Sequence, residues 1–332
     1  MQMKINRGLF KTLLILAGVI LLVALFFVLL SQWESHYKKV DSAVVDSSED
    51  ECLYVNDACY VPKKDLETVL LIGVDKFEGQ IQENSYNNSE QSDFLMLLVL
   101  DKENQSWTAL HLNRDTMTEI PVLGVRGESA GSITGQLALA HTYGSGGADS
   151  CRNTQKAVSG LLYGQDIDHY VSFTMDAVGE VNDLAGGVTL TMLDDLSSAY
   201  PEMQKGATVK LSGDMALAYV RTRYGLEDST NLRRMERQRQ YLTALSETLS
   251  GKKSVDENFL MKALEKISPY MVSDCTANQL LQLYDWWETY TSNGFRTVEG
   301  VAEKGAEFME FYPDETSLKQ LVVDLFYTPA EE

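Results

Sequence analysis

Arginine side chains are concentrated in one short part of this 332-residue chain. Six of its eleven arginines lie between positions 221 and 239, although the formal net charge of the whole chain is −20. A guanidinium keeps its charge and donates two parallel hydrogen bonds, a geometry that suits phosphate. An acidic chain that gathers its arginines in one segment is therefore expected to hold an anion there.

The pattern within this segment predicts which side chains face inward. A helix is expected from about Asn231 to Gly251, with one apolar, core-facing stripe formed by Met235, Tyr241, Leu242, Leu245 and Leu249. Arg234 and Gln238 fall on this stripe, one turn apart. Because an unpaired buried charge costs several kcal/mol, Arg234 is expected to have a partner or a ligand.

The other arginines divide into two groups. Arg221 and Arg223 are two residues apart, so an extended segment would direct both side chains from the same face. Arg233, Arg237 and Arg239 flank the buried stripe, and a solvated, salt-bridged surface is an equal alternative for Arg233 and Arg239.

Acidic residues occur where buried strands are expected to end. Asp75 follows an apolar run at 68–74, Asp93 precedes another at 94–100, and Asn113-Arg114-Asp115 follows a third at 107–112. If the first two strands are antiparallel, Asp75 and Asp93 lie at the same edge. Two carboxylates there could hold Mg²⁺ together with phosphate oxygens. For each aspartate alone, a capping or turn role is the simpler interpretation.

The order of these runs predicts the fold. Further strands are expected at 169–173 and 188–192, and helices at 149–163 and 175–184. Strands without clean alternation are typical of sheets covered on both faces. We therefore expect an α/β fold, a three-layer domain with a central mixed sheet flanked by helices and preceded by one N-terminal transmembrane helix.

The N-terminal segment predicts a membrane anchor. Residues 12–30 form an uncharged apolar run of nineteen, long enough to span a bilayer, with three basic residues before it and no small-residue cleavage site after it. Basic residues before the run place residues 1–11 in the cytoplasm as a basic tail. An acidic extracytoplasmic stalk is expected at 31–64, a catalytic domain at 65–252, and a helical extension packed on it at 253–332.

Charge and cysteines restrict the possible partners. Beyond residue 30 the chain has 25 basic and 48 acidic residues, a balance of −23, which argues against binding duplex DNA. Cys52 and Cys59 flank a short loop and could form a disulfide outside the cell, leaving Cys151 and Cys275 as a second pair. Four free thiols are the alternative if the chain faces the cytoplasm.

Seven segments, in order, resemble the LytR-CpsA-Psr family. They cover residues 66 to 250 and read VLLIGVD, QSDFLMLLVLD, LHLNRDTMTEIP, GQLALAHTYG, YVSFTMDAVGEVNDLAGGVTL, LSGDMALAYVRTRY and RRMERQRQYL. The resemblance implies a membrane-anchored phosphotransferase of cell-wall biogenesis. Such enzymes move a glycopolymer phosphate, as in teichoic acid or capsule attachment, from a polyprenyl-pyrophosphate carrier to peptidoglycan.

The resemblance also implies roles for individual residues. Asp75 and Asp93 match magnesium ligands of the family. Its pyrophosphate-binding positions are matched by Arg114, Arg221, Arg223, Arg234, Gln238 and Gln136, of which Arg114, Arg221 and Arg223 are also expected to be catalytic. Asp115 matches a further catalytic position, as a base or as an arginine partner.

Two departures from the family pattern remove cations near the phosphates. Gln91 stands where the family often has Arg, and Gln136 where it usually has Lys. Each loss could weaken anion binding by roughly 1–3 kcal/mol. Two other hypotheses therefore remain: a non-catalytic envelope protein that binds polyprenyl phosphates, and a transcriptional regulator, which the expected extracytoplasmic location disfavours.

The lipid tail of such a carrier requires an apolar groove. Met215, Ala216, Leu217, Tyr219 and the apolar face of the last helix are candidates to line it, although core packing is the simpler role for each.

Overall fold

The computed structural model describes residues 53–55, 58–75, 90–124, 126–223, 225–227, 230–256 and 258–330. The chain divides into two compact units, one of Met1–Val61 with Pro329–Glu332 and one of Pro62–Thr328. In the described part of the first unit, β1 (Leu53–Val55) pairs antiparallel with β2 (Ala58–Pro62). The described end of the expected stalk is therefore a hairpin, and the rest of the stalk at 31–52 lies outside the described residues. The apolar run 12–30 lies outside the described residues.

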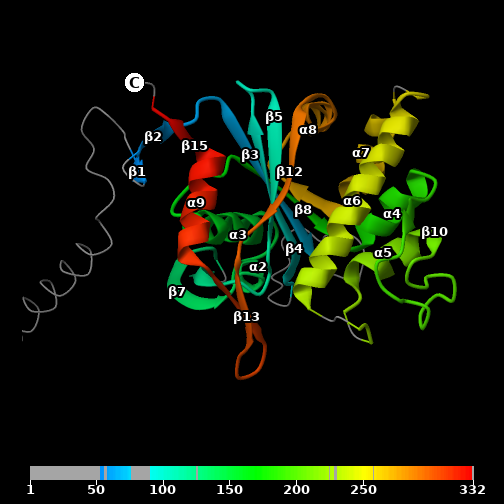
Figure 1. Cartoon of the computed structure of the whole chain (residues 1–332), viewed down its shortest axis with the longest axis horizontal. Coiled ribbons are helices and arrows are strands. Elements are labelled where there is room, and N and C mark those ends of the chain that lie inside the picture. Colours follow the sequence, from blue (N-terminus) through cyan, green and yellow to red (C-terminus); the bar gives the residue numbers. More distant parts are fainter. Residues whose placement is uncertain are drawn as a thin grey trace, which may run out of the picture. The chain divides into compact units, whose positions relative to one another are not determined.

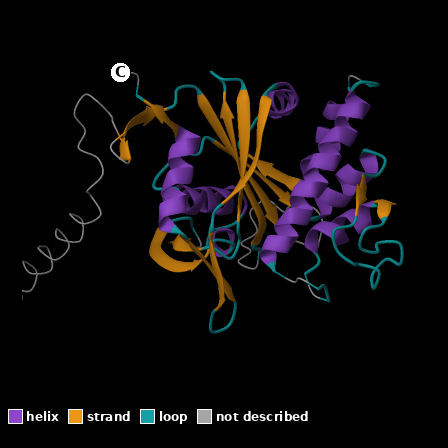
Figure 2. Cartoon of the chain, in the orientation of Figure 1, coloured by secondary structure: helices purple, strands orange, loops and turns teal. Residues whose placement is uncertain are grey.

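A six-stranded mixed sheet forms the centre of the larger unit (Figure 2). Its strand order is β11 (Met271–Ser273), β8 (His169–Thr174), β3 (Leu66–Val74), β4 (Ser92–Asp101), β5 (Ser106–Leu112) and β12 (Thr291–Thr297). β4 is antiparallel to both β3 and β5, whereas β8 is parallel to β3 and β12 is parallel to β5. The antiparallel arrangement of the first two predicted strands is confirmed.

Helices cover both faces of this sheet (Figure 1). One face packs against α3 (Gly147–Leu161) and α9 (Glu315–Phe326), with the short α2 (Leu139–Thr142) beside them. The other face lies toward α4 (Asp176–Leu184), α6 (Asn231–Lys253) and α8 (Ala277–Thr289), accompanied by α5 (Gly213–Arg221), α7 (Phe259–Ile267) and the 3₁₀ turn Ser268–Tyr270. The predicted three-layer α/β arrangement, with a central mixed sheet flanked by helices, is confirmed.

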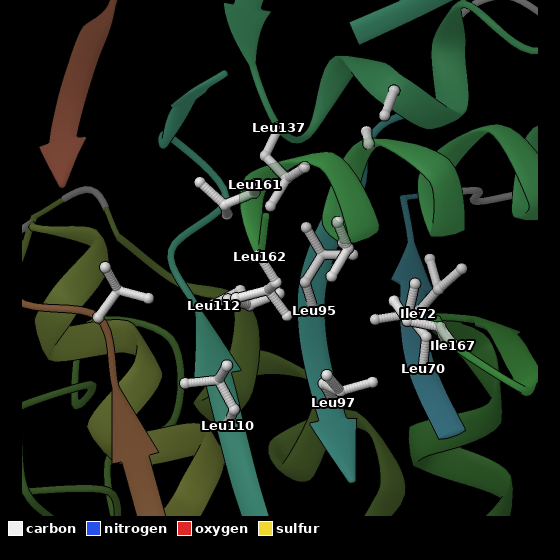
Figure 3. Close-up of a cluster of buried hydrophobic side chains, with 14 of the residues drawn as sticks. Leu70, Ile72, Leu95, Leu97, Leu110, Leu112, Leu137, Leu161, Leu162 and Ile167 are labelled. Carbon is white, nitrogen blue, oxygen red and sulfur yellow. The ribbon is translucent and has the colours of Figure 1, made fainter. Parts of the chain in front are cut away.

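Alternate residues of each strand enter different layers of the core. On β3, Leu70 and Ile72 join the cluster under α3 and α9, whereas Val69 joins the cluster on the opposite face with Trp107. Figure 3 shows the first cluster, in which strand side chains meet those of α3 and neighbouring loops: Leu70, Ile72, Leu95, Leu97, Leu110 and Leu112 with Leu137, Leu161, Leu162 and Ile167. Burial on both faces explains why these strands lack polar alternation.

Three two-stranded sheets lie outside the central one. They are β6 (Met117–Leu123) with β7 (Ser129–Gln136), β9 (Thr189–Thr191) with β10 (Thr208–Lys210), and β13 (Gly300–Lys304) with β14 (Met309–Pro313). Most residues of β7 and all of β13 are exposed, so these strands carry no continuous apolar run. Of these six strands the sequence predicted only β9, at 188–192.

The C-terminal region is part of the core domain. It was expected to be a helical extension at 253–332, but β11 and β12 form the two edges of the central sheet and β13–β14 a hairpin, before the chain reaches β15 (Tyr327–Pro329). Trp107 of β5 stacks on Trp287 of α8, with ring centroids 3.9 Å apart, and donates a hydrogen bond to its carbonyl oxygen. The helices of the expected extension are present as α7, α8 and α9, but the region also contains strands, so the prediction of a purely helical extension is wrong.

The cysteines also differ from the expected pairing. Cys59 belongs to a disulfide, and Cys52 lies outside the described residues. Cys151, which is buried under the sheet, and Cys275 are free thiols, so the expected second disulfide between them is absent. Because Cys59 is disulfide-bonded, the alternative of four free thiols is also wrong. No helix in the described part of the chain is both long and apolar enough to cross a bilayer.

Candidate functional site

Three strand ends bring the predicted acidic and basic side chains to one edge of the sheet. Asp75 follows β3, and its backbone nitrogen donates to the carbonyl oxygen of Gln91, 3.2 Å away, beside the start of β4. Asp93 is the second residue of β4. Since β5 is antiparallel to β4, Arg114 and Asp115 leave β5 at the same edge. The expectation that Asp75 and Asp93 share an edge is confirmed.

Guanidinium groups from separate elements contact these carboxylates. Asp93 Oδ1 forms an ion pair with Arg114 Nη1 and lies 3.5 Å from Arg234 Nη1. Asp75 Oδ1 lies 2.7 Å from Arg221 Nη2. The backbone carbonyl of Asp93 accepts a further hydrogen bond from Arg234 Nη2. The site is therefore built from β3, β4, the end of β5, and the facing ends of α5 and α6.

Two helix ends position these arginines. Ser212 caps α5 by accepting from the Met215 nitrogen, and Arg221 is the last residue of that helix, where a cation interacts favourably with the helix dipole. Thr222 then adopts extended backbone angles, so Arg221 is helical rather than extended as expected. Thr230 caps α6 through the Arg233 nitrogen, which places Arg234 in its first turn.

The cluster holds more positive charge than its carboxylates neutralise. Burial, followed by the charges of Arg114 and Arg223, lowers the pKa of Arg234 to about 9. Burial also lowers the pKa of Arg114. The charge of Asp115 opposes this shift, and the charge of Arg223 adds to it. Arginine still carries its proton at neutral pH. These shifts mean that an added anion would stabilise the site, because like charges are held close together in a desolvated place.

Several buried polar atoms of the site lack a well-aligned hydrogen-bond partner within the described residues. They include Nε of Arg234, whose side chain is 2% exposed, and Oδ1 of Asp75 and of Asp93, which meet arginines as ion pairs. Gln238, which is 4% exposed, interacts with His111 through its side chain. The amide nitrogen of Gln238 donates to the Val220 carbonyl oxygen at 3.1 Å. Buried polar groups are rarely left unsatisfied in folded proteins. Nε of Arg234 is therefore available to an anion bound beside the arginine cluster.

A pair of asparagines, which residue spacing did not indicate, connects the strand end to the helix. Asn231 Nδ2 donates to Asn113 Oδ1 at 2.6 Å, and Asn231 Oδ1 accepts from Arg234 Nη2 at 2.6 Å. Asn113 Oδ1 also accepts from the Asp115 nitrogen. All these groups are buried, so the network fixes Arg234 relative to Asp115. Asparagine at a helix start resembles an ordinary cap, which hides this role.

The two glutamines at departures from the family pattern both lie in the site. Gln91 Oε1 accepts from Arg114 Nη2 at 3.4 Å. Gln136 Nε2 lies 3.2 Å from Asp115 Oδ1 and donates to the Met309 carbonyl oxygen at 2.6 Å. Asp115 Oδ1 is also 3.2 Å from Arg114 Nε. Asp115 is thus an arginine partner in this structure, and phosphate contact by Gln136 stays a prediction.

A second ion-pair cluster lies behind the first. Asp194 Oδ1 is 2.9 Å from Arg233 Nε, and its Oδ2 is 3.4 Å from Arg237 Nε. Arg237 is almost fully buried, contacts the ring of Tyr219, and donates to the carbonyl oxygen of Thr222. Arg233 therefore has a buried partner and is not simply a surface residue. Asp194 was not predicted, because in the sequence it resembles the exposed acids of ordinary loops, although it is buried.

Arg239 lies apart from both clusters. Its Nη1 is 3.5 Å from Nδ1 of His111, on the face of β5 that also carries a ring contact with Phe94. Burial, followed by the charges of Arg239 and Arg234, lowers the pKa of His111 to about 3. His111 is therefore neutral in the folded protein above this pH.

An apolar cavity of about 260 Å³ adjoins the polar site. It is lined almost entirely by apolar groups from β3, β4, β8 and helices α4 to α7: Leu71, Gly73, Phe94, Phe173, Thr174, Met175, Ala177, Val178, Val181, Val220, Gln238, Tyr241, Leu242, Leu245 and Ile267. Gln238 belongs to both the cavity and the polar site. Part of the predicted helical stripe, Leu242 and Leu245, faces this cavity.

The residues suggested earlier as groove lining have another role. Met215, Ala216 and Tyr219 are buried in a separate cluster with β9 and β10, and neither they nor Leu217 line the cavity. The apolar face of α9 packs under the opposite face of the sheet. Core packing, the simpler interpretation, is correct for the three buried residues of α5 and for α9.

Comparisons with known proteins agree with this arrangement. The polyisoprenyl-teichoic acid–peptidoglycan teichoic acid transferase TagU of Halalkalibacterium halodurans is 30% identical over 186 residues, which are 56% of this chain and 54% of TagU. TagV of Bacillus subtilis, named for the same activity, is 26% identical over 284 residues, 80% of this chain and 66% of TagV. The chain thus spans about half to two thirds of these relatives.

A solved structure shares the fold. The structure of TagT bound to LI-WTA matches with a TM-score of 0.59 at 21% sequence identity, over 85% of this chain and 96% of that one. The model of the LytR_cpsA_psr family matches residues 28–323, which is most of the chain. This protein, whose arginines and aspartates meet beside an apolar cavity, belongs to the LytR_cpsA_psr family.

Proposed function

We propose that the protein is a membrane-anchored, Mg²⁺-dependent phosphotransferase that moves a glycopolymer phosphate from a polyprenyl-pyrophosphate carrier to peptidoglycan. The observation that supports this most is the junction between the arginine cluster and the apolar cavity, where Gln238 belongs to both. A ligand with a diphosphate and a long apolar tail would satisfy both parts. The names of the relatives TagU and TagV support the same chemistry.

The arginines would act mainly through charge. In the transfer, an acceptor hydroxyl loses its proton and its oxygen bonds to the glycan phosphorus, as the bond to the bridging oxygen breaks and polyprenyl phosphate leaves. Phosphoryl transfer requires positioning and charge neutralisation more than covalent help from the protein. Arg114, Arg221, Arg223 and Arg234 surround one region from three elements, and this preorganised charge is suited to a diphosphate and its leaving group.

The carboxylates of the site fit a magnesium ion. Asp75 and Asp93 lie at one sheet edge, and the Oδ1 atom of each is buried and paired with arginine guanidinium groups. One or two carboxylates with phosphate oxygens form the ligand set that Mg²⁺ prefers. When bound, the ion would neutralise phosphate charge. In the protein alone, arginines pair with the same two aspartates and neutralise the carboxylate charge.

The location of the site relative to a membrane follows from the sequence. We propose that residues 12–30 span the cell membrane once, with the N-terminus in the cytoplasm and the folded domain outside. The disulfide of Cys59 supports this orientation, because disulfides persist in oxidising compartments. Both the lipid carrier and peptidoglycan would then be within reach of the site.

Substitution of one accessible arginine tests the proposal. Arg221 pairs with Asp75 and is partly exposed, so Arg221→Ala is expected to fold and to bind a polyprenyl-pyrophosphate glycan about 10- to 100-fold more weakly, as one charge-assisted interaction is lost. Arg152→Ala, which removes an exposed arginine paired with Asp149, is the control and should bind as the parent does.

The assay combines the purified full chain, Mg²⁺, the lipid-linked donor and a peptidoglycan oligomer. Transfer by the parent protein, with loss in Arg221→Ala, supports the proposal. Tight, Arg221-dependent binding of the lipid without any transfer would instead identify a non-catalytic carrier-binding protein. Absence of transfer together with unchanged lipid binding by Arg221→Ala would remove both functions.

A further inference from the structure

The apolar cavity defines the side of the site from which the leaving group departs. Its lining comes from β3, β4, β8 and α4 to α7, and the described parts of β6, β7, β13 and β14 contribute none of it. In phosphoryl transfer the attacking and leaving oxygens lie roughly in line on opposite sides of the phosphorus. If the lipid occupies the cavity, the acceptor hydroxyl approaches from the side of Asp115 and Gln136.

The β13–β14 hairpin is attached to that side of the site. The backbone nitrogen of Phe311 donates to the Asp115 carbonyl oxygen at 2.9 Å, and Phe311 pairs with Thr116 in an isolated parallel bridge. Gln136 joins the Met309 carbonyl to the Asp115 carboxylate. Phe311 is 2% exposed and packs into the core, so the base of the hairpin is fixed. Figure 1 shows the hairpin projecting beyond the helices from this base.

The two strands of the hairpin approach each other unusually closely at their base. A Cβ on Gly300 would lie 2.2 Å from the Tyr312 carbonyl oxygen and 2.8 Å from Cζ of Phe311. Only glycine fits between these groups. In this pairing Val301 lies opposite Tyr312 and Glu303 opposite Glu310, on the face directed away from Phe311.

This outer face combines an aromatic ring, an apolar side chain and carboxylates. Val301 and Tyr312 are 58% and 45% exposed, and Tyr312 Oη donates to Glu310 Oε2 at 2.6 Å, which restrains the ring. A hollow of about 400 Å³ lies on this face, lined by Gly300, Val301, Glu303, Tyr312, Pro313 and Asp314. An exposed, restrained tyrosine ring can pack against the apolar face of a ligand, and neighbouring carboxylates can accept hydrogen bonds from its hydroxyl groups.

We propose that this outer face of the β13–β14 hairpin is the binding surface for the acceptor glycan strand. The inference rests on the proposed function and adds the place where its second substrate binds. The CH face of a pyranose ring packs on Tyr312 and Val301, and sugar hydroxyls donate to Glu303 or Asp314. Residues 300–314 contain four acids and one lysine, a balance that disfavours an anionic membrane surface or a polyanionic polymer as the occupant.

The test separates acceptor binding from donor binding. Tyr312→Ala is made in the full chain, with Tyr312→Phe as the conservative variant, which keeps the ring and removes only the bond to Glu310. The matched control is Tyr54→Ala, which removes a tyrosine of β1 that is 72% exposed and does not belong to the β13–β14 hairpin. Binding of a β-1,4-linked N-acetylglucosamine tetramer is measured by titration, and transfer is measured at varied acceptor and saturating donor.

The expected pattern is specific to the acceptor. Tyr312→Ala should raise the acceptor KM and the tetramer Kd by about tenfold, with kcat at saturating acceptor and affinity for the lipid donor unchanged. Tyr54→Ala should resemble the parent, and Tyr312→Phe should keep most of the acceptor affinity because it keeps the ring. An unchanged acceptor KM in Tyr312→Ala, or a fall in kcat alone, would overturn the assignment.

Failure of the surface and failure of the enzyme give different results. If the parent transfers and Tyr312→Ala has the same KM and kcat, the proposed glycan surface is wrong and the proposed phosphotransferase function stands. If the parent shows no transfer and yet binds the tetramer in a way that depends on Tyr312, the phosphotransferase function is wrong and the glycan surface stands.

Discussion

Asp194 and Arg237 show how a buried pair can serve a site without facing its ligand. Arg237 donates to the carbonyl of Thr222, the residue between Arg221 and Arg223, and Asp194 supplies the charge that keeps Arg237 inside the protein. Arg233 pairs with the other oxygen of the same carboxylate. Arg237 therefore holds the segment from which Arg221 and Arg223 project, and Asp194 supplies its counter-charge.

Substitution of Asp194 tests this positioning role. Asp194→Asn keeps the shape but leaves Arg237 without its counter-charge, and removing one member of a buried pair costs about 3–5 kcal/mol. The variant is expected to unfold at lower urea concentration and, where still folded, to bind pyrophosphate more weakly. Asp195→Asn, a change at the exposed neighbour that bonds only to Ser197, should alter neither property. Normal pyrophosphate binding by folded Asp194→Asn would leave Asp194 a purely structural residue.

Single residues were predictable from sequence where local pattern determines their place. Arg234 and Gln238 are buried as the helical stripe indicated, and the aspartates meet because strand ends meet. Asp194 and Asn113 were not predictable, because their partners lie dozens of residues away along the chain. Such contacts depend on tertiary packing, which residue spacing does not encode.

At the scale of elements, the cavity lies between strands β3, β4 and β8 of the sheet and the helices α4 and α6. Gly73 of β3 contributes to this space: a Cβ there would lie 2.9 Å from Cβ of Phe94. Val181 on α4 and Leu245 on α6 face the same space. Side chains on these elements therefore determine how much of this space is open.

A larger side chain in the cavity should act on the lipid tail alone. Val181→Phe places a ring in the space, and we expect at least about tenfold weaker binding of a long-chain polyprenyl pyrophosphate, because each excluded CH₂ loses about 0.8 kcal/mol. Binding of inorganic pyrophosphate should not change. Val255→Phe, at a position 87% exposed and outside the cavity, is the matched control. Equal lipid affinity in the two variants would show that the tail binds elsewhere.

Long apolar elements could be located from the sequence, and short exposed ones could not. β3, β4, β5 and α6 were predicted to within a few residues because burial imposes a pattern on them. β7 and β13 are almost entirely exposed, and β12 contains Gly294 and polar residues, so their pairing depends on partners supplied by the rest of the fold. This is why the C-terminal region was wrongly predicted to be helical.

For the whole molecule, two buried histidines make stability depend on pH. Burial lowers the pKa of His141 to about 4, and burial with nearby arginines lowers that of His111 to about 3. Below an unfolded-state pKa of about 6.5 the unfolded chain binds protons that the folded protein excludes. Their contribution to stability is therefore complete above about pH 6.5 and is lost as pH falls toward the folded values.

Urea unfolding at two pH values checks this. Each histidine is expected to lower the free energy of unfolding by roughly 2 kcal/mol between pH 7 and pH 5, a slope of about 1.4 kcal/mol per pH unit. His111→Asn should remove about half of the combined histidine effect. A free energy of unfolding that is equal at the two pH values, or that rises on acidification, would contradict the assignment.

The stacked indoles of Trp107 and Trp287 give the folded protein an optical signal of its own. The two rings lie nearly parallel at 3.9 Å and belong to the first and last thirds of the chain. Chromophores this close couple their electronic transitions and should give the native protein an exciton couplet in circular dichroism, with quenched emission. Loss of that signal would report, without any label, the moment at which the C-terminal third separates from the sheet.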